Sequence, residues 1–336
     1  MLDPARGKIM FEAVLGTRAR GGFIIRKDLV AKVLPPVILI AIFLGFGIAE
    51  GRVLLPENLL NIVIQTSYLS IFAIAQTIVL VTRGFDLSLG GIVSVVSVTT
   101  ALALTSLGLG GDTLAVFAGL LCGLMFGVIA GSFNGMLVAQ FHVNPFIATL
   151  GTYNICLGIA TTVSSGRPVF NLPEDFAIWT YSGDLFGLPI PVLVVAIVGL
   201  LVYVLFSHTT LGRAFFIIGS NERAAVVAGL PTRRIIIAAY TLSAVATAIG
   251  AILLTGRTGS GEPSLGGTLT LQSIAAAVIG GVSLRGGRGS VAAALFGALF
   301  VTVLANGMNL TQINGYVQMI VLGVTVILSA TLDRFR

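Results

Sequence analysis

The sequence contains ten separate hydrophobic segments, each long enough to cross a lipid bilayer if short or tilted spans are allowed, and no other feature limits the fold as much. A bilayer core about 30 Å thick requires about 20 apolar residues in an α-helix. Lipid offers no hydrogen-bond partner to the backbone, so each segment is expected to be helical. The sequence therefore predicts an all-α integral membrane protein. The segments comprise residues 33–49, 60–82, 88–107, 114–138, 146–164, 189–206, 235–256, 268–284, 290–306 and 314–331.

The basic residues predict the orientation of these segments, because Lys and Arg in short loops favour the cytoplasmic side. With the N-terminus in the cytoplasm, all but three of the 19 Lys and Arg residues fall inside, and the exceptions are Arg52, Arg167 and Arg257. The net charge of +6 is therefore interpreted as a topology signal and not as a nucleic-acid surface. We expect a cytoplasmic tail over residues 1–32, a membrane domain over 33–331 and a second cytoplasmic tail over 332–336.

The loop 207–234 is expected to lie in the cytoplasm and to carry one short helix. Ser220 or Asn221 can cap the start of this helix, Glu222 adds negative charge to its first turn, and Gly229 with Pro231 ends it. A helix of about two turns is not stable alone in water, so it must dock on the membrane domain or on another protein. Outside, the loop near 165–188 is expected to hold a short surface helix near 173–181 that receives an external partner.

Motifs for enzyme chemistry are missing from the sequence. Lysine occurs only at positions 8, 27 and 32, and none of these closes a GxxxxGK phosphate loop. His142 and His208 lie far apart without metal-type spacing, and Cys122 and Cys156 sit in apolar runs, where they are interpreted as packing residues. We therefore expect no catalytic residue, no metal site and no cofactor in this chain.

Uncharged polar residues recur inside the hydrophobic segments. Asn61, Gln65, Tyr68 and Gln76 fall near one stripe of the second segment. Polar side chains in a membrane must face other helices or water, so they either line a passage or form interhelical hydrogen bonds. Both interpretations remain open, as they do for Asn306, Asn309, Asn314 and Gln318. Glycines at positions 123, 127, 131 and 135 predict close helix packing along one face.

The tetrad Ser-Leu-Gly-Gly occurs twice, at Ser88–Gly91 and at Ser264–Gly267. The charge pattern places the first copy at the cytoplasmic side and the second at the outer side. This relation is expected if segments 1–5 and 6–10 form two inverted repeats, because an odd number of spans reverses the second half. Chance similarity in a glycine-rich chain is the alternative.

Four stretches carry a resemblance to a known family. They read TRGFDLSLGG at 82–91, VNPFIATLGT at 143–152, TLGRAFFIIGSNERAAVVAGL at 210–230 and SIAAAVIGGVSLRGGRGS at 273–290. The chain resembles the permease subunits of bacterial ABC importers of the ribose, xylose, arabinose and galactoside branch. The resemblance implies a location in the inner membrane and a second permease, identical or related. It also implies two cytoplasmic subunits that bind ATP and magnesium, and an extracytoplasmic sugar-binding protein.

The resemblance also implies roles for particular residues. The loop 210–230 looks like the coupling helix that sits in a groove of the ATPase, and a sugar or polyol is expected to cross by alternating access. Gln76, Gln272 and Ser273 depart from the family pattern and leave the substrate open. An ion-driven carrier, a channel and a membrane-embedded enzyme are the alternatives, and each lacks its usual polar or charged groups here. The expected coupling residues are Arg213, Gly219, Asn221, Glu222, Arg223, Ala224, Ala225 and Gly229. The expected passage residues are Asn61, Gln65, Tyr68, Gln76, Asp86, Asn144, Phe146, Asn306 and Asn309.

Overall fold

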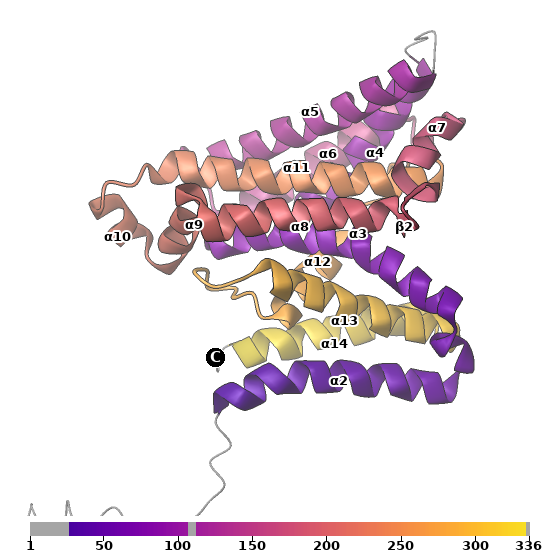
Figure 1. The fold of residues 1–336 in the computed structure, drawn as a ribbon. Coiled ribbons are helices and arrows are strands. Elements are labelled where there is room, and N and C mark those ends of the chain that lie inside the picture. The colour runs from indigo at the N-terminus through magenta and orange to yellow at the C-terminus, as the bar shows by residue number, and fades with distance from the viewer. Residues whose placement is uncertain (1–26, 107–111, 334–336) are drawn as a thin grey trace, which may run out of the picture. The chain divides into compact units, whose positions relative to one another are not determined.

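The structure, a computed structural model, describes residues 27–106 and 112–333 and is helical along most of them (Figure 1). One compact unit covers residues 39–336 and contains every helix from α3 onward, and residues 1–38 form the other unit. The first helices are α2 (Lys27–Ala49), the 3₁₀ turn η1 (Gly51–Leu54), α3 (Pro56–Val81), α4 (Leu89–Ser106), α5 (Asp112–Ala139) and α6 (Pro145–Val163). A short outer segment follows with α7 (Glu174–Ala177), the π-helical turn η2 (Ile178–Ser182), β1 (Asp184–Leu185) and β2 (Leu188–Pro189). The chain ends with α8 (Ile190–His208), α9 (Thr210–Ser220), α10 (Glu222–Val227), α11 (Thr232–Thr258), α12 (Leu269–Gly280), α13 (Val291–Leu310) and α14 (Gly315–Asp333).

Each of the ten hydrophobic segments forms a helix, which confirms the all-α fold class. Within the described residues, six helices are long and apolar enough to cross a membrane, namely α3, α5, α6, α8, α11 and α13. The apolar stretches of α2, α4, α12 and α14 are shorter. Proline and capping residues mark several helix starts: α3 and α6 begin at a proline, and the Ser290 side chain accepts a hydrogen bond from the Ala293 N–H at the start of α13.

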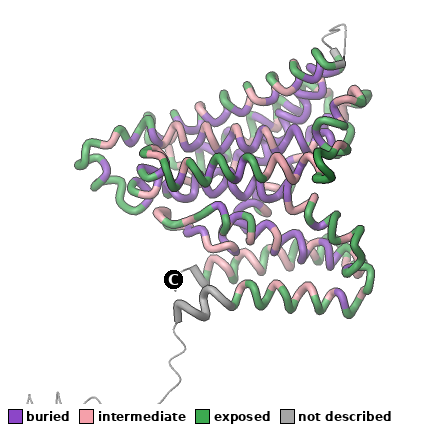
Figure 2. The backbone as a smooth tube through the Cα atoms, in the orientation of Figure 1, coloured by how far each residue is buried: buried purple, intermediate pink, exposed green. Residues whose placement is uncertain are grey.

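The buried core runs along α3, α4 and α11, as the purple stretches of Figure 2 show. Helix α5 packs against α11 through its glycines. A Cβ added at Gly127, Gly131 or Gly135 would meet Ala248, Ala244 or Ile237 of α11 closer than carbon atoms normally approach. The prediction that these glycines serve close helix packing is confirmed, because the bare backbone of α5 takes the place of side chains.

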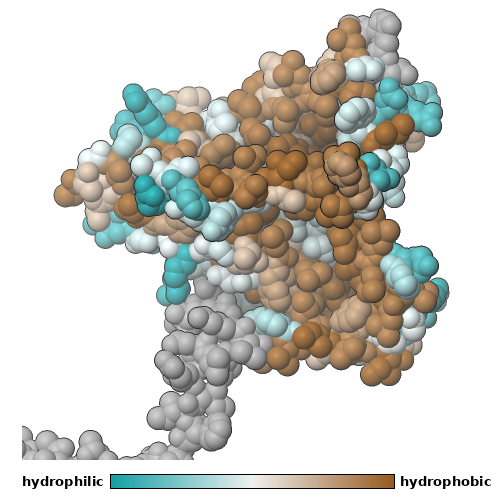
Figure 3. Space-filling view, viewed as in Figure 1, coloured by the Kyte–Doolittle hydropathy of each residue, from teal (hydrophilic) through white to brown (hydrophobic). Residues whose placement is uncertain are grey.

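Hydrophilic residues gather at two opposite ends of residues 39–333, and a hydrophobic band lies between them (Figure 3). One end carries α9 and α10, and the other carries α7 and β2 (Figure 1). The loops predicted inside contact one another, since the Gly287 N–H donates to the Val81 carbonyl at 2.9 Å. The loops predicted outside do the same, since Val169 and Gly261 form a two-way backbone bridge. The two strands pair antiparallel, with Asp184 opposite Pro189 and Leu185 opposite Leu188.

One expectation about the loops changes and another is met. The predicted single helix of the loop 207–234 is wrong, because the structure has two helices there, α9 and α10, and α8 extends to His208. Thr209 explains α9, since its hydroxyl oxygen accepts a hydrogen bond from the Gly212 N–H at 3.0 Å and starts a new helix directly after α8. The outer helix expected near 173–181 is present as α7 and η2.

The predicted N-terminal and C-terminal tails lie largely outside the described residues. The tail 1–32 lies outside the described residues up to position 26, and α2 begins at Lys27, earlier than the predicted end of the tail. At the other end α14 continues to Asp333, and the remainder of the predicted tail 332–336 lies outside the described residues.

Candidate functional site

Helix α9 is attached firmly to the membrane helices. Phe215 and Ile218 are fully buried on its inner face. Gly219 lies so close to the end of α3 that an added Cβ would collide with the Val81 carbonyl oxygen and crowd the Gly287 N–H. Three segments distant in sequence therefore meet at Gly219: α9, the end of α3 and the loop between α12 and α13. A displacement of α9 cannot leave α3 unaffected, because packed backbone has no room to absorb it.

Helix α10 projects from this attachment at the far left of Figure 1. The Asn221 side chain accepts a hydrogen bond from the Ala224 N–H at 3.0 Å, so Asn221, one of the two residues predicted for this role, is the N-cap. Gly229 ends the helix with a φ of 77°, a left-handed conformation that suits glycine. Ala225 is buried, whereas Val226 is 56% and Val227 is 89% exposed. An apolar pair is therefore presented to water at a hydrophilic end of the protein.

Arginines lie on α10 and on the two helices next to it in the chain. Arg213, Arg223, Arg233 and Arg234 are all exposed, and none of the four forms an ion pair with another described residue. At the opposite end, by contrast, Arg52 pairs with Glu50 at 3.0 Å. The surface around α10 therefore offers unpaired positive charge next to exposed valines, a composition suited to an acidic protein partner with an apolar pocket.

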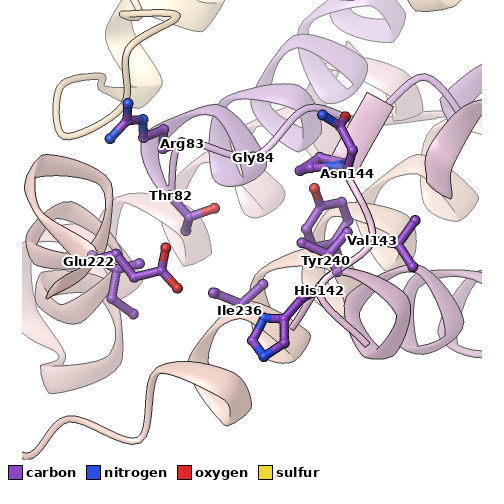
Figure 4. Close-up of a pocket in the computed structure, with 12 residues that line it drawn as sticks. Thr82, Arg83, Gly84, His142, Val143, Asn144, Glu222, Ile236 and Tyr240 are labelled. Atoms are coloured by element: carbon purple, nitrogen blue, oxygen red, sulfur yellow. The ribbon is translucent and has the colours of Figure 1, made fainter. Parts of the chain in front are cut away.

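A cavity of about 330 Å³ lies directly behind α10. It is bounded by the end of α3, the connection between α5 and α6, and α9, α10 and α11. Figure 4 shows the Glu222 carboxylate directed toward this space and the His142 imidazole at its edge, whereas the Arg83 guanidinium points away from it. Because Glu222 is the first residue of α10, a movement of this helix changes the shape of a space shared with α3 and α11.

The two Ser-Leu-Gly-Gly tetrads touch each other. The Gly90 N–H donates to the Thr270 hydroxyl at 2.9 Å, and the Gly266 N–H donates to the Ser94 hydroxyl at 3.2 Å. A Cβ on Gly266 would collide with the backbone of Gly90. The expectation that the tetrads lie on opposite sides is wrong, because each follows a non-helical stretch that turns back into the helix bundle.

Asp86 is buried and belongs to this turned-back stretch. Its carboxylate accepts hydrogen bonds from the Ser88 N–H at 2.8 Å and from the Ser88 hydroxyl at 2.5 Å. The Asn134 amide donates to the same hydroxyl at 2.8 Å, and the Leu87 N–H donates to Thr149 at 3.0 Å. These contacts hold the chain before α4, and the role of Asp86 in a passage stays a prediction.

The polar stripe of α3 passes from the surface into the core. The Gln65 amide donates to Asn61 at 2.9 Å near the outer end. Tyr68 is buried, with the Arg257 guanidinium 5.3 Å from the centre of its ring. Gln76 is fully buried, and neither polar atom of its amide has a hydrogen-bond partner among the described residues. The structure therefore does not bring these four side chains onto one common surface.

The other expected passage residues fall into separate groups. Asn306 and Asn58 exchange two hydrogen bonds, at 2.9 and 3.0 Å, and join α13 to α3. Asn309 accepts from Gln318 of α14 at 2.8 Å. Asn144 caps α6 by accepting from the N–H of Phe146, whose exposed ring lies 6.3 Å from that of Phe85. Interhelical hydrogen bonding accounts for Asn306 and Asn309, whereas a passage role stays a prediction for every member of the set.

Comparison with known proteins places the chain in a family. A model of the family described as "Branched-chain amino acid transport system / permease component" matches residues 58–330. The chain is 36% identical to the ribose import permease of Escherichia coli K12, over 82% of this chain and 85% of the relative. It is 32% identical to the galactose/methyl galactoside import permease of Haemophilus influenzae, over 88% and 92%. The D-allose transport system permease of E. coli K12 is 30% identical, over 88% and 89%.

The chain belongs to this permease family. Among its members the chain is a sugar ABC importer permease, a multi-pass protein of the inner membrane and a transporter subunit. Permeases of this kind work with an ATPase and a binding protein. No solved structure matches the chain.

Helix α9 of the permease and its anchoring residues were not predicted from the sequence. The signals were present: Thr209 is a capping residue, and Phe215 and Ile218 repeat at helical spacing. These signals were ambiguous because the α9 sequence is apolar enough to be taken for a continuation of the membrane-spanning segment before it. The valine pair of α10 was also missed, since nothing in the sequence tells whether an apolar residue next to Ala225 faces the protein or the solvent.

Proposed function

We propose that the permease is the membrane-spanning part of an importer for a neutral sugar or polyol. Its relatives are named for ribose, D-allose and galactose or methyl galactoside, which makes a monosaccharide the first substrate class to test. Two permease subunits, identical or related, form the core. Two cytoplasmic ATPase subunits hold ATP and magnesium, and an extracytoplasmic binding protein delivers the sugar.

The proposed topology has ten membrane crossings with both termini in the cytoplasm, and the two halves of five helices form inverted repeats. The grouping of the loops at two ends supports this topology, because loops predicted on the same side contact one another. The meeting of Gly90 with Gly266 supports the repeats, since a pair of turned-back stretches that start from opposite sides is expected from inverted halves.

The observation that carries the proposal is the exposed apolar face of α10, with Val226 and Val227 directed away from the protein. A six-residue helix gains too little from its own hydrogen bonds to be kept as an isolated projection. Docking of this face in a groove of the ATPase buries both valines, and the arginines around it favour an acidic rim.

Movement of the ATPase then reaches the membrane helices by contact. Helix α10 pushes on α9, and Gly219 passes the displacement to the end of α3 and to the loop between α12 and α13. Two arrangements of this junction, one with the passage open outward and one with it open inward, make up alternating access.

The experiment is co-purification of the tagged permease from its native membrane in mild detergent. Val227→Asp should lose the ATPase, because burying an unpaired carboxylate in an apolar groove is strongly unfavourable. Phe186→Asp is the matched control, since Phe186 is 96% exposed at the opposite end, and it should retain the ATPase. Equal recovery of the ATPase with Val227→Asp and the unchanged permease refutes the docking assignment.

Transport measurements extend the test. Charge reversal at Glu222 or Arg223, or Gly229→Val at the left-handed position, should reduce transport and substrate-stimulated ATP hydrolysis while the permease remains in the membrane. Normal coupling in all three variants contradicts the proposal.

A further inference from the structure

The stretch before α12 is irregular and exposed at a depth where lipid would be expected. Helix α12 has 12 residues, so it extends about 18 Å from the loop that contacts Val81. Its first residue, Leu269, therefore lies near the middle of a bilayer core about 30 Å thick. Ser264, Gly267 and Thr268 precede it in non-helical conformation, and all three are exposed.

Exposed irregular backbone is not stable against lipid. Each unpaired backbone group in hydrocarbon costs several kcal/mol, so such segments occur only inside protein or along a water-filled space. The turned-back stretch before α4 satisfies this condition by burial, since Asp86, Ser88 and the first turn of α4 are covered. The stretch before α12 pairs part of its backbone within its own turns, since the Gly267 N–H donates to the Ser264 carbonyl at 3.1 Å, but its outer side is exposed and requires water, a polar solute or the second permease.

A cavity of about 220 Å³ opens beside the same stretch, between α12, α13 and α14. Its polar side chains are Thr268, Gln272 and Gln318, and the rest of the lining is apolar, including Met308 and Met319. It contains no charged side chain. A neutral cavity with donors, acceptors and adaptable apolar walls suits a neutral hydroxylated solute better than an ion.

Some hydrogen-bonding groups that line this cavity have no partner among the described residues. The Gln318 amide nitrogen donates to Asn309 at 2.8 Å and to the Ile313 carbonyl at 2.9 Å, which leaves its oxygen as a fixed acceptor. The half-buried Gln272 side chain has no hydrogen-bond partner among the described residues. In the stripe predicted from the sequence, by contrast, Asn61 and Gln65 bind each other.

We propose that this cavity and the exposed stretch 264–268 line the sugar passage, and that the Gln272 amide contacts hydroxyl groups of the passing sugar. The proposal rests on the sugar-import function given above. It places the passage at the start of α12 instead of along the polar stripe of α3, and it makes Gln272 a specificity-determining residue.

The first test uses the complete importer reconstituted in vesicles, with uptake of labelled D-ribose, D-allose and D-galactose. Gln272→Leu keeps the size of the side chain and removes its hydrogen bonds, so transport of the accepted sugar should fall about tenfold. Gln272→Glu should change the ranking of the three sugars, because a carboxylate only accepts hydrogen bonds. Asn154→Leu is the matched control, since this exposed amide of α6 lies outside the cavity, and transport should be unchanged.

The second test measures access directly. Gln272→Cys and Thr268→Cys, each in a permease with Cys122 and Cys156 replaced by alanine, should react with a polar thiol reagent. Sugar-loaded binding protein together with ATP should slow that reaction. Failure of both cysteines to react overturns the proposal in favour of a dry contact with the second permease, and so do unaltered rates and sugar ranking in both Gln272 variants. If the unchanged importer moves none of the three sugars, the proposed function fails in this form, whatever the cysteines do.

Discussion

Helices α4 and α12 start from nearly the same sequence and meet different surroundings. Asp-Leu-Ser-Leu-Gly-Gly precedes and begins α4 at 86–91, and Glu-Pro-Ser-Leu-Gly-Gly precedes α12 at 262–267. Residues 88–101 are buried, whereas the corresponding stretch before α12 is exposed at several positions. The comparison shows that a short motif can specify a turn back into the bundle without specifying what covers it.

The hydrogen bonds of the two stretches also differ, and those before α4 are again the more deeply buried. Before α4, Asp86 accepts two hydrogen bonds from Ser88, and the Ser88 hydroxyl accepts a further one from Asn134 of α5. The stretch before α12 is joined to α4, because the Glu262 N–H donates to Ser97 at 3.1 Å, and the Glu262 carboxylate accepts from the Ser260 hydroxyl at 2.8 Å. The carboxylate before α4 is therefore enclosed in a network of buried groups, whereas its counterpart before α12 is half-buried and accepts from one hydroxyl of the described residues.

The largest expected effect is at the contact between the two motifs. Gly266→Ala places a Cβ against the backbone of Gly90, and relief requires separation of α4 from the α12 stretch, at a cost of about 3 kcal/mol. Gly267→Ala is the control, because its nearest neighbour would be the Ser264 carbonyl at an ordinary 3.4 Å. Thermal unfolding in detergent should show a large loss for the first variant and little for the second. Similar unfolding temperatures contradict the close contact.

A smaller effect is expected at Asp86. Asp86→Ala leaves the buried Ser88 N–H without its acceptor, which should lower the free energy of unfolding by about 2 kcal/mol. Asp86→Asn retains one oxygen acceptor and should lose less. The measurement is the same unfolding assay, and a loss from Asn as large as that from Ala would mean that the negative charge matters more than the acceptor.

The smallest effect is expected at Glu262, the counterpart of Asp86. Its side chain is half-buried and accepts from one hydroxyl, so Glu262→Ala should cost less than about 1 kcal/mol. A loss equal to that of Asp86→Ala would contradict the smaller contribution expected from the half-buried carboxylate before α12.

Local signals predicted much of the coupling region. Asn221 caps α10 and Gly229 ends it, as the residues indicated, because capping and left-handed glycine act within a few positions. The spacing of the glycines in α5 predicted close packing, although not that α11 is the partner. The separation of α9 from α8 was missed, since both are apolar and only the Thr209 cap divides them.

The polar residues were harder to place, because burial depends on neighbours that are remote in sequence. Gln76 and Gln65 lie on the same helix, yet one is fully buried and the other partly exposed. Asn306 could be recognised as polar and intramembrane, but its partner Asn58 is 248 positions away. Spacing along one helix identifies a stripe and cannot tell whether another helix covers it.

The sequence by itself determined the helical membrane fold and the caps of α10, and its charges predict the side of each loop. These properties follow from the length of apolar runs, from charge and from hydrogen bonds between near neighbours. Only the tertiary structure decided that the two Ser-Leu-Gly-Gly tetrads meet, that Asp86 is enclosed and that Gln272 borders a cavity. The physical reason is that backbone contact, enclosure and open space are set by which helices become neighbours, and no local stretch of the chain encodes its neighbours alone.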